Sequence, residues 1–507
     1  MALALIKALA AKLSPVSGMS SVMPIAFAEI NSQCDGRALV NSVILYGFCV
    51  ANTNFMSTNV THALRFWIGP FLFLLALCLP LSGPKALVIG GAAWMLSWWL
   101  TEIIHLGATA LLPLLLFGGT GLLDQSTLAM AYAHPLIFLF MGGFFLAKAM
   151  EHQGLHSLLA KRILALSGSQ PRQALAGSML ATWLLSMWMS NTATAVMMLP
   201  LTLSLVKQLK GSDLLERRIL LGLAWAANLG GMATLIGTPP NVLFAAFLED
   251  STGVVMDFWT WSSMAIPVSV ILMLAAYVQL QVGLSMASSE ALPKPNKQPW
   301  TTGQRRMAFV FFLTAMAWMT RSWVASMIAL PHYSDTWIAI TASLVMFSLP
   351  AGKRQGPLLP WSIAKDIEWG ILLLFGGGLA LASGLKASGL LDVMGGVSSQ
   401  MEIILWIGVA AAAGVWLTEL FSNMALVSAM LPIALALSLA KGIPFEAVAI
   451  PLTMGASCAF MLPVATPPNA LVFATGKLKI LHMVQHGVWM NIFATLVIWA
   501  VCALSFV

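Results

Sequence analysis

Long apolar runs follow one another closely from Phe66 to the C-terminus of this 507-residue chain, and few charged residues interrupt them. A helix needs about 20 predominantly apolar residues to cross the hydrocarbon core of a bilayer. Nine runs are typical of single crossings, namely 66–82, 86–101, 103–118, 131–150, 258–282, 307–329, 336–349, 367–385 and 487–506. The pattern predicts an all-α membrane protein.

Four further apolar regions do not fit a single crossing. Residues 173–206 and 403–440 each contain two half-length apolar stretches around a polar centre. Residues 219–248 and 447–476 are uncharged segments with a Gly or Pro break in the middle. The pattern predicts a hairpin for each of the first two regions and a broken helix for each of the other two. With the broken helices counted as crossings, about 11 transmembrane helices are expected.

The region 173–206 is too short for two crossings with a turn and too long for one. Basic residues precede it and follow it, and Lys and Arg are enriched in cytoplasmic loops. The segment is therefore expected to enter and leave on the same side, as a re-entrant hairpin with its tip near Ser190–Thr192. Irregular backbone at this depth is tolerated only inside protein or along a polar cavity, so the tip is a candidate site.

The distribution of basic residues agrees with this topology. Assigning alternate loops places 17 of the 25 Lys and Arg on the cytoplasmic side, four on the opposite side and four in the N-terminal segment. A Pro-containing linker, 283–306, separates a first half, 65–282, from a second half, 307–507. Residues 1–64 form an N-terminal extension with no clear crossing. It resembles a poor signal peptide, and translation from Met56 is the alternative.

Composition narrows the class of protein. Hydrophobic residues make up 59% of the chain and charged residues only 8%, whereas soluble domains carry about a quarter charged residues. This excludes a soluble enzyme, a secreted globular protein and a disordered chain. The net charge of +7 is attributed to cytoplasmic loops rather than to a nucleic-acid partner. The five cysteines show neither metal-ligand spacing nor a disulfide framework.

The two halves share three motifs in the same order. Phe140–Gly143 recurs as Phe375–Gly378, and Gly237–Asn241 recurs as Ala465–Asn469. Residues 190–205 match 422–437 at eight positions, including Ser-Asn and Met-Leu-Pro. Five predicted crossings separate the two hairpins, and an odd number places the second hairpin on the opposite face. Inverted repeats with hairpins and broken helices are typical of secondary transporters with a midplane site.

The duplicated motifs have a chemical interpretation. Helix ends at a tip offer free N–H groups to an anion, and hydroxyl and carbonyl oxygens to a cation such as Na⁺. Ser186 and Thr418 lie one turn before the two Ser-Asn pairs and add a further oxygen each. An isolated Ser-Asn-Thr would more often only bond a neighbouring helix; the duplication favours a site. Glu419 adjoins the second tip, where it is expected to stabilise the tip or take part in coupling.

Two Ser-Asn hairpins, each followed about 45 residues later by Thr-Pro-Pro-Asn, resemble the divalent anion/sodium symporter family of di- and tricarboxylate and sulfate transporters. The stretch from Trp99 to Pro113 is also similar to that family, and the resemblance covers the chain from about residue 66 onward. It implies a homodimer in the inner (plasma) membrane, with a scaffold and a mobile transport domain that moves as an elevator.

The resemblance also implies site residues. Sodium sites are expected at Ser186, Ser190, Asn191 and Gly237, and at Thr418, Ser422, Asn423 and Ala465. The anionic substrate is expected at Ser190, Asn191, Thr192, Ser422, Asn423, Thr466 and Pro467. The chain departs from the strictest family pattern at Met424, where Thr often follows Ser-Asn, and this puts the identity of the substrate in question.

These patterns predict a transporter rather than an enzyme: sodium-coupled uptake of a divalent anion, foremost a C4-dicarboxylate such as succinate, malate or fumarate. Na⁺ is the expected coupling ion, and no Lys or Arg beside the tips replaces its charge. The alternatives are a sulfate or citrate symporter and a proton-coupled or anion-exchanging permease of related fold. A membrane-embedded enzyme would need a His/Asp/Glu cluster at depth, whereas the eight His are dispersed.

Overall fold

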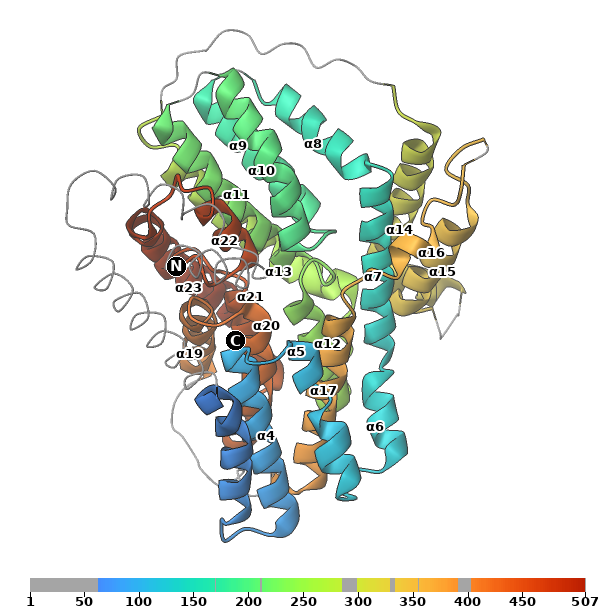
Figure 1. The fold of residues 1–507 in the computed structure, drawn as a ribbon, viewed down its shortest axis with the longest axis vertical. Coiled ribbons are helices and arrows are strands. Elements are labelled where there is room, and N and C mark those ends of the chain that lie inside the picture. Colours follow the sequence, from blue (N-terminus) through green and yellow to red (C-terminus); the bar gives the residue numbers. More distant parts are fainter. Residues whose placement is uncertain are drawn as a thin grey trace, which may run out of the picture. The chain divides into compact units, whose positions relative to one another are not determined.

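The computed structural model describes residues 63–168, 170–209, 212–284, 299–328, 333–353, 355–390 and 403–506. Across these ranges all extended regular structure is helical, and the only β pairing is an isolated bridge between Pro350 and Pro357. The all-α prediction is confirmed (Figure 1). The chain divides into two units, Met1–Arg65 and Phe66–Val507, and apart from the first residues of the helix Ala63–Leu77 everything below concerns the second. Most of the predicted extension and of the linker lies outside the described residues.

The helices of the first half follow the predicted order. After Ala63–Leu77 they are α4 (Gly83–Thr101), α5 (Leu106–Thr109), the π-helical turn η2 (Leu114–Gly118), α6 (Gln125–Tyr132), α7 (Pro135–His152), α8 (Leu155–Leu166), α9 (Pro171–Ser186), α10 (Asn191–Gln208), α11 (Asp213–Ala233), α12 (Pro239–Thr252) and α13 (Phe258–Leu280).

The second half repeats much of this order. Its helices are α14 (Thr302–Ile328), α15 (Asp335–Ser348), α16 (Trp361–Ala364), α17 (Trp369–Ala387), α19 (Ile403–Leu417), α20 (Asn423–Lys441), α21 (Phe445–Ala456), α22 (Pro467–Phe473) and α23 (Ile480–Phe506).

Six helical stretches of the described chain are long and apolar enough to cross a membrane. They are Gln125–His152, Phe258–Leu280, Thr302–Met327, Trp369–Ala387, Asn423–Lys441 and Ile480–Phe506. Shorter apolar helices cover several of the remaining predicted crossings, among them Ala63–Leu77 and Asp335–Ser348. The predicted count of about 11 crossings stays a prediction.

Two local features differ from the sequence pattern. The run 103–118 is shorter and less regular than one α-helical crossing: the His105 side chain caps the start of α5, and Pro113, which has no N–H to donate, precedes the π-helical turn η2, so the apolar helix covers only Leu106–Gly118. Helix α8 was not expected. Its lysine and arginine, Lys161 and Arg162, suggested a polar flank, but they lie on one side of a helix whose other side buries His156 and Ala160.

The four interrupted regions are each two helices with irregular backbone between them. In the first hairpin region, α9 and α10 lie side by side, and the start of α9 and the end of α10 face the top of Figure 1. In the broken-helix regions, α12 and α22 each begin with two prolines. Proline is tolerated in the first helical turn but stops a helix that precedes it. The chain is therefore unwound at 234–238 and at 457–466.

The two halves pack crosswise. Helix α9 packs along α11, and α19 packs in the same way along α21. Helix α12 of the first half contacts α20 and α21 of the second, while α22 contacts α10 and α11. Each helix break therefore lies among helices from both halves of the chain.

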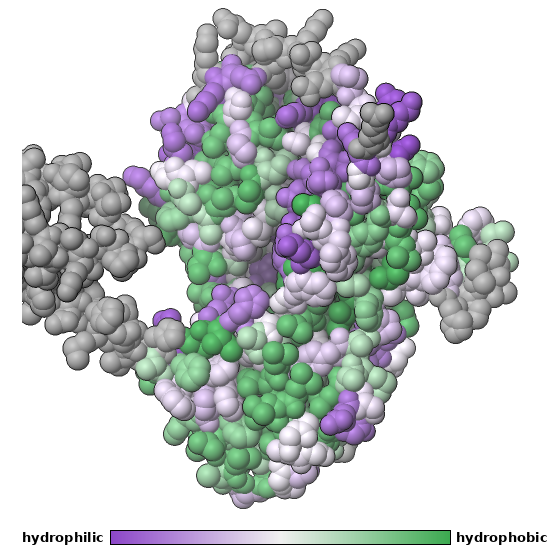
Figure 2. Space-filling model, turned by 45° about the vertical axis from the view of Figure 1, so that its right-hand side comes forward, coloured by the Kyte–Doolittle hydropathy of each residue, from purple (hydrophilic) through white to green (hydrophobic). Residues whose placement is uncertain are grey.

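Much of the outer surface is apolar. Hydrophobic residues form broad areas of the face shown in Figure 2, above all in its lower half, and hydrophilic residues are more frequent in the upper half of that view. Large side chains such as Leu115, Trp323 and Leu504 are mostly exposed. Soluble monomers rarely expose apolar patches of this extent, so this surface is suited to contact with lipid.

Candidate functional site

The first hairpin tip is held by side chains of the predicted motif. The Ser190 hydroxyl accepts a hydrogen bond from the Ala193 N–H at 3.3 Å and so caps α10. The Ser186 hydroxyl, at the end of α9, lies 2.9 Å from Asn191 Oδ1 and 2.7 Å from the Ala227 carbonyl oxygen of α11. These contacts join both arms of the hairpin to the helix that precedes the first break.

Two glycines let the first tip approach the first break. A Cβ at Gly231 would collide with the side-chain amide of Asn191. A Cβ at Gly237 would lie 2.5 Å from the carbonyl oxygen of Gly231. The absent side chains therefore allow direct packing of the Asn191 amide, the end of α11 and the unwound segment. Three of the four residues predicted for the first sodium site, Ser186, Asn191 and Gly237, meet around Gly231.

The second hairpin tip repeats these contacts. The Ser422 hydroxyl accepts a hydrogen bond from the Ala425 N–H at 3.4 Å and caps α20. The Thr418 hydroxyl lies 2.8 Å from Asn423 Oδ1 and 2.7 Å from the Ala456 carbonyl oxygen. The two capping serines also have nearly equal backbone angles, φ −58° and ψ 143° at the first and φ −63° and ψ 142° at the second.

An asparagine from each Thr-Pro-Pro-Asn motif holds its unwound segment in place. Asn241 Nδ2 donates to the Thr234 carbonyl at 2.8 Å, and Asn469 Nδ2 donates to the Leu462 carbonyl at 3.1 Å. Both asparagines are fully buried. Their amides occupy backbone carbonyls that the interrupted helices leave without an intrahelical donor, so the breaks have a defined shape.

The two breaks are connected to each other through α11. Asn228 Nδ2 donates to the Ala459 carbonyl at 3.0 Å and to the Thr466 hydroxyl at 3.2 Å. The Trp225 indole donates to the Phe460 carbonyl at 3.1 Å. Sequence reasoning missed Asn228; the available signal was an uncharged polar residue inside a long apolar run.

Glu419 binds the backbone of the second break. Its carboxylate accepts hydrogen bonds from the N–H groups of Phe460, Met461 and Leu462, at 2.8 to 3.1 Å. The side chain is only 3% exposed. At the corresponding position of the first tip stands Met187, whose backbone carbonyl accepts from the Thr234 hydroxyl at 2.5 Å. The expectation that Glu419 stabilises the tip now has a specific partner, the unwound segment.

The remaining predicted residues differ in exposure. Ser190, Asn191, Ser422 and Asn423 are partly exposed, Thr192 and Pro467 are exposed, and Gly237, Ala465 and Thr466 are buried. Met424 is buried as well. Within the described ranges no hydrogen bond joins one tip directly to the other; the connection runs through the breaks. The assignment of these residues to sodium and substrate stays a prediction.

Comparison with known proteins identifies the family. The family model described as "Citrate transporter" matches residues 96–455. The sodium-dependent dicarboxylate transporter SdcS of Staphylococcus saprophyticus is 35% identical over 480 residues, which cover 87% of this chain and 91% of that protein. The protein of the same name from Staphylococcus aureus strain USA300 is 34% identical over 470 residues, or 85% and 88% of the two chains. The chain belongs to the citrate transporter family.

Membership in the citrate transporter family makes this chain a multi-pass transporter of the plasma membrane and not an enzyme. It also confirms the resemblance inferred from the duplicated motifs. The matched residues include the first hairpin, the first break and the whole of the second hairpin. The family model ends just before the second break, whereas the alignments to the two staphylococcal transporters cover more of the chain.

Apart from the Glu419 carboxylate, whose oxygens accept from backbone N–H groups of the second break, the oxygen atoms at the breaks are neutral. In the described part of the chain no group of three or more His, Cys, Asp and Glu could hold a metal ion. Four buried oxygens near the breaks have no hydrogen-bond partner there: Asn228 Oδ1, Asn241 Oδ1, Asn469 Oδ1 and Ser457 Oγ. Amide, hydroxyl and carbonyl oxygens suit a hard, weakly charged cation. The donor set therefore fits Na⁺ as a transported ion.

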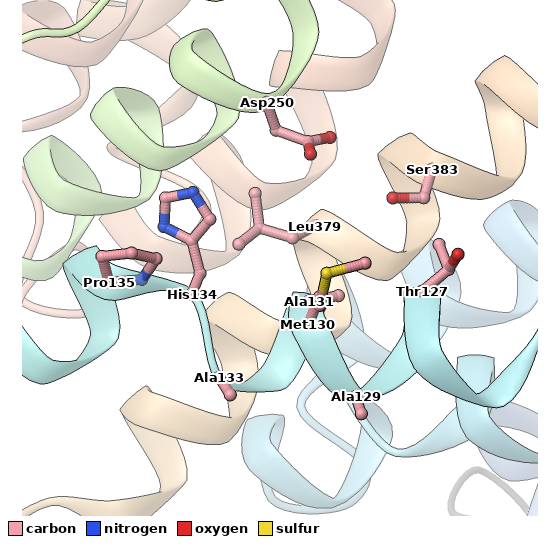
Figure 3. Close-up of a pocket in the computed structure, with 10 residues that line it drawn as sticks. All are labelled: Thr127, Ala129, Met130, Ala131, Ala133, His134, Pro135, Asp250, Leu379 and Ser383. Carbon is pink, nitrogen blue, oxygen red and sulfur yellow. The ribbon is translucent and has the colours of Figure 1, made fainter.

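A separate cavity of about 460 Å³ lies away from the tips (Figure 3). It is lined from α6, α7, α12 and α17, and its polar side chains include Thr127, His134, Asp250 and Ser383. None of the predicted site residues lines it. His134 also caps α7 through its Nδ1, which accepts from the Leu136 N–H at 3.3 Å. Capping of α7 thus gives this histidine a structural role.

Proposed function

We propose that this protein is a sodium-coupled transporter that takes up a C4-dicarboxylate. The observation that carries the proposal is the pair of matching tips and breaks in a chain whose relatives are named sodium-dependent dicarboxylate transporters. Each tip presents the start of a capped helix together with a serine and an asparagine. A dicarboxylate has two anionic ends, and two half-sites of this kind suit it.

Coupling to sodium follows from the charges of the site. The segments 173–206, 219–248, 403–440 and 447–476 contain no Lys or Arg, and their one acidic residue is Glu419. Burying a dianion without a compensating charge is costly. The starts of α10 and α20 supply partial positive charge, and bound cations supply the rest. Ser186, Ser190, Asn191 and Gly237, and Thr418, Ser422, Asn423 and Ala465, are the proposed sodium residues.

The substrate is proposed to bind between the tips, at Ser190, Asn191, Thr192, Ser422, Asn423, Thr466 and Pro467. The contact of Asn228 with Thr466 supports this placement, because it brings a residue of the first half to the second half-site. Met424 adds an apolar wall where a hydroxyl would bind polar substrate atoms. A small, unbranched dicarboxylate needs fewer such contacts than citrate does.

Transport is proposed to follow an elevator motion in a homodimer built from inverted repeats. The crosswise packing of α12 on α20 and of α22 on α10 supports a transport unit formed by both halves. Between α10 and α19, the structure describes five segments that can serve as crossings: α11 with α12, α13, α14, α15 and α17. An odd number of crossings supports the inverted relation of the hairpins.

The hydrogen bonds of Glu419 disfavour the proton-coupled alternative. A proton carrier must gain and lose a proton during the cycle, yet both oxygens of this carboxylate accept from backbone N–H groups. Those bonds need an acceptor on each oxygen, and the ionised form supplies acceptors only. We therefore propose that Glu419 stays ionised and fixes the second break.

Uptake of labelled succinate into proteoliposomes tests the proposal. An inward Na⁺ gradient should drive accumulation, and an equal K⁺ gradient should not. Unlabelled malate and fumarate should compete, with citrate and sulfate competing less. Uptake unchanged on removing the Na⁺ gradient would contradict sodium coupling. If citrate competed more strongly than malate and fumarate, citrate rather than a C4-dicarboxylate would be the substrate.

A further inference from the structure

An apolar groove lies between two packed helices, and none of the proposed transport residues lines it. Helices α13 and α23 contact each other, and the groove of about 340 Å³ between them is lined by Ala275, Gln279, Trp489, Phe493 and Leu496, among others. Trp489 is 66% exposed. The α23 residues of the groove span about 10 Å along the helix axis. This length matches several methylene groups of an acyl chain.

A basic cluster lies at one end of the groove. Gln279, which lines the groove, donates through Nε2 to the His486 carbonyl at 2.8 Å. The His486 ring is in turn 2.6 Å from Arg218 Nη1. Arg217 and Lys479 lie on the same two helix ends as Arg218 and His486. The groove therefore leads directly to cationic side chains.

Within the described part of the chain, the charge of this cluster has no acidic partner. Among the described residues, no carboxylate lies within ion-pair distance of Arg217, Arg218 or Lys479. The nearby Glu216 is paired instead with Lys477 at 3.3 Å. The Nε of Arg218 has no hydrogen-bond acceptor in the same part of the chain. A half-buried guanidinium whose one hydrogen-bonded side-chain partner is an imidazole is suited to an external anion.

We propose that the groove between α13 and α23 is a binding site for an anionic phospholipid. One acyl chain lies against Ala275, Phe493 and Leu496, and the phosphate pairs with the cluster of Arg217, Arg218 and Lys479. Arg218 is the sixth residue of α11 and His486 the seventh of α23, so both sit about 7–9 Å inside their helix ends. Lipid phosphates reach this depth beside apolar chains, and basic pockets between helices on the cytoplasmic side bind such headgroups.

A soluble anion fits these observations less well than a lipid does. A free phosphate would leave the adjoining apolar groove uncovered, whereas a phospholipid occupies both parts at once. The position of Trp489 at the start of the groove agrees with a membrane interface, where indole side chains gather. The basic cluster thus adjoins the apolar groove in the same way that the phosphate of a phospholipid adjoins its acyl chains.

Native mass spectrometry of the purified full-length protein tests the proposal. Phosphatidylglycerol should be retained at least about fivefold better than phosphatidylcholine of the same chain length, as expected for a pairing of this strength. It should also raise the unfolding temperature more. Arg218→Gln should lower retention of phosphatidylglycerol, while Lys353→Gln, an exposed basic position outside the cluster, should not. Equal retention of the two lipids by the unaltered protein would overturn the proposal.

The groove has its own matched pair of variants. Ala275→Phe fills it and should reduce retention, whereas Val278→Phe on an exposed side of the same helix should not. If Arg218→Gln does not fold, Lys479→Gln at an exposed position replaces it and should also lower retention of phosphatidylglycerol. Stabilisation by glycerol 3-phosphate equal to that by the lipid would assign the cluster to a soluble anion. Unchanged retention in both Ala275→Phe and Lys479→Gln would also refute the site.

Discussion

The first helix break is held by a neutral hydrogen bond, from the Thr234 hydroxyl to the Met187 carbonyl, and the second by the carboxylate of Glu419. The capping serines and the asparagines of the two halves otherwise make corresponding hydrogen bonds. The ionised Glu419 that we propose attracts a cation to the second break more strongly than the neutral groups of the first break can. The two tips and breaks therefore share a construction but differ in the group that holds the break, a hydroxyl in the first half and a carboxyl group in the second.

The tips differ as well. After the Ser-Asn pair the first tip has the exposed hydroxyl of Thr192, and the second has the buried thioether of Met424. The first tip thus offers one more hydrogen bond to an anion, while the second tip lies beside the carboxylate. We infer that the first half-site contributes more to substrate recognition and the second more to binding of the cation. Four sets of variants test this difference.

The largest loss of transport is expected on substitution of the asparagine that both tips share. Asn191→Ala and Asn423→Ala each remove an amide that bonds the preceding hydroxyl and is proposed to bind both ion and substrate. Each should lower sodium-driven succinate uptake about a hundredfold or more, because hydrogen bonds to charged groups are lost. Folding should change little, as measured by unfolding temperature. Ser263→Ala on the exposed side of α13 is the control, and full activity in either variant would remove that half-site from the mechanism.

Glu419→Gln should have the next largest effect. The NH2 group that replaces one carboxylate oxygen faces backbone N–H groups and cannot accept from them, which costs about 1–3 kcal/mol. The Na⁺ concentration for half-maximal uptake should rise about tenfold, with a smaller change in maximal rate. Met187→Leu keeps the backbone carbonyl of the first break and should leave sodium dependence unchanged. Equal effects of the two substitutions would contradict the proposed difference between the breaks.

The hydroxyls one turn before the tips should have smaller and equal effects. Ser186→Ala and Thr418→Ala each remove one donor to Asn and to a backbone carbonyl, worth about 1 kcal/mol. Each should weaken apparent affinity for Na⁺ about fivefold, as measured by sodium titration of uptake. Thr418→Ser and Ser186→Thr keep the hydroxyl and should restore affinity. A loss in one half without a loss in the other would mark that hydroxyl as the more important.

The smallest effect is expected at the position that differs between the tips. Met424→Thr supplies the second tip with a hydroxyl, and it should change the ratio of succinate to citrate uptake by less than about fivefold. Sodium dependence should stay unchanged, because Met424 is not among the proposed sodium residues. Thr192→Met is the reciprocal variant and should weaken uptake of succinate. A changed sodium dependence in Met424→Thr would place this side chain nearer to the ion than we propose.

The sequence pattern was informative about elements and motifs for physical reasons. Capping serines and paired prolines act locally, so the starts of α10, α20, α12 and α22 could be read from the residues themselves. The run at 103–118 and helix α8 could not, since their boundaries depend on a histidine cap and on packing. Glu419 binds the N–H groups of three residues about 40 positions away, and Asn228 binds Thr466 of the other half. A local sequence pattern cannot predict contacts between segments so distant along the chain.

The crosswise packing of the halves has a consequence for assembly of the protein. Asn228 and Trp225 find their partners more than 230 residues further along the chain. Contacts of such long sequence separation form late, because a large loop must close before they contribute. During synthesis the side chains of Asn228 and Trp225 must therefore stay without these partners until the second break has been made. Quality control that acts on nascent chains will meet the transport core in an incomplete form, with polar side chains inside the membrane awaiting the second half.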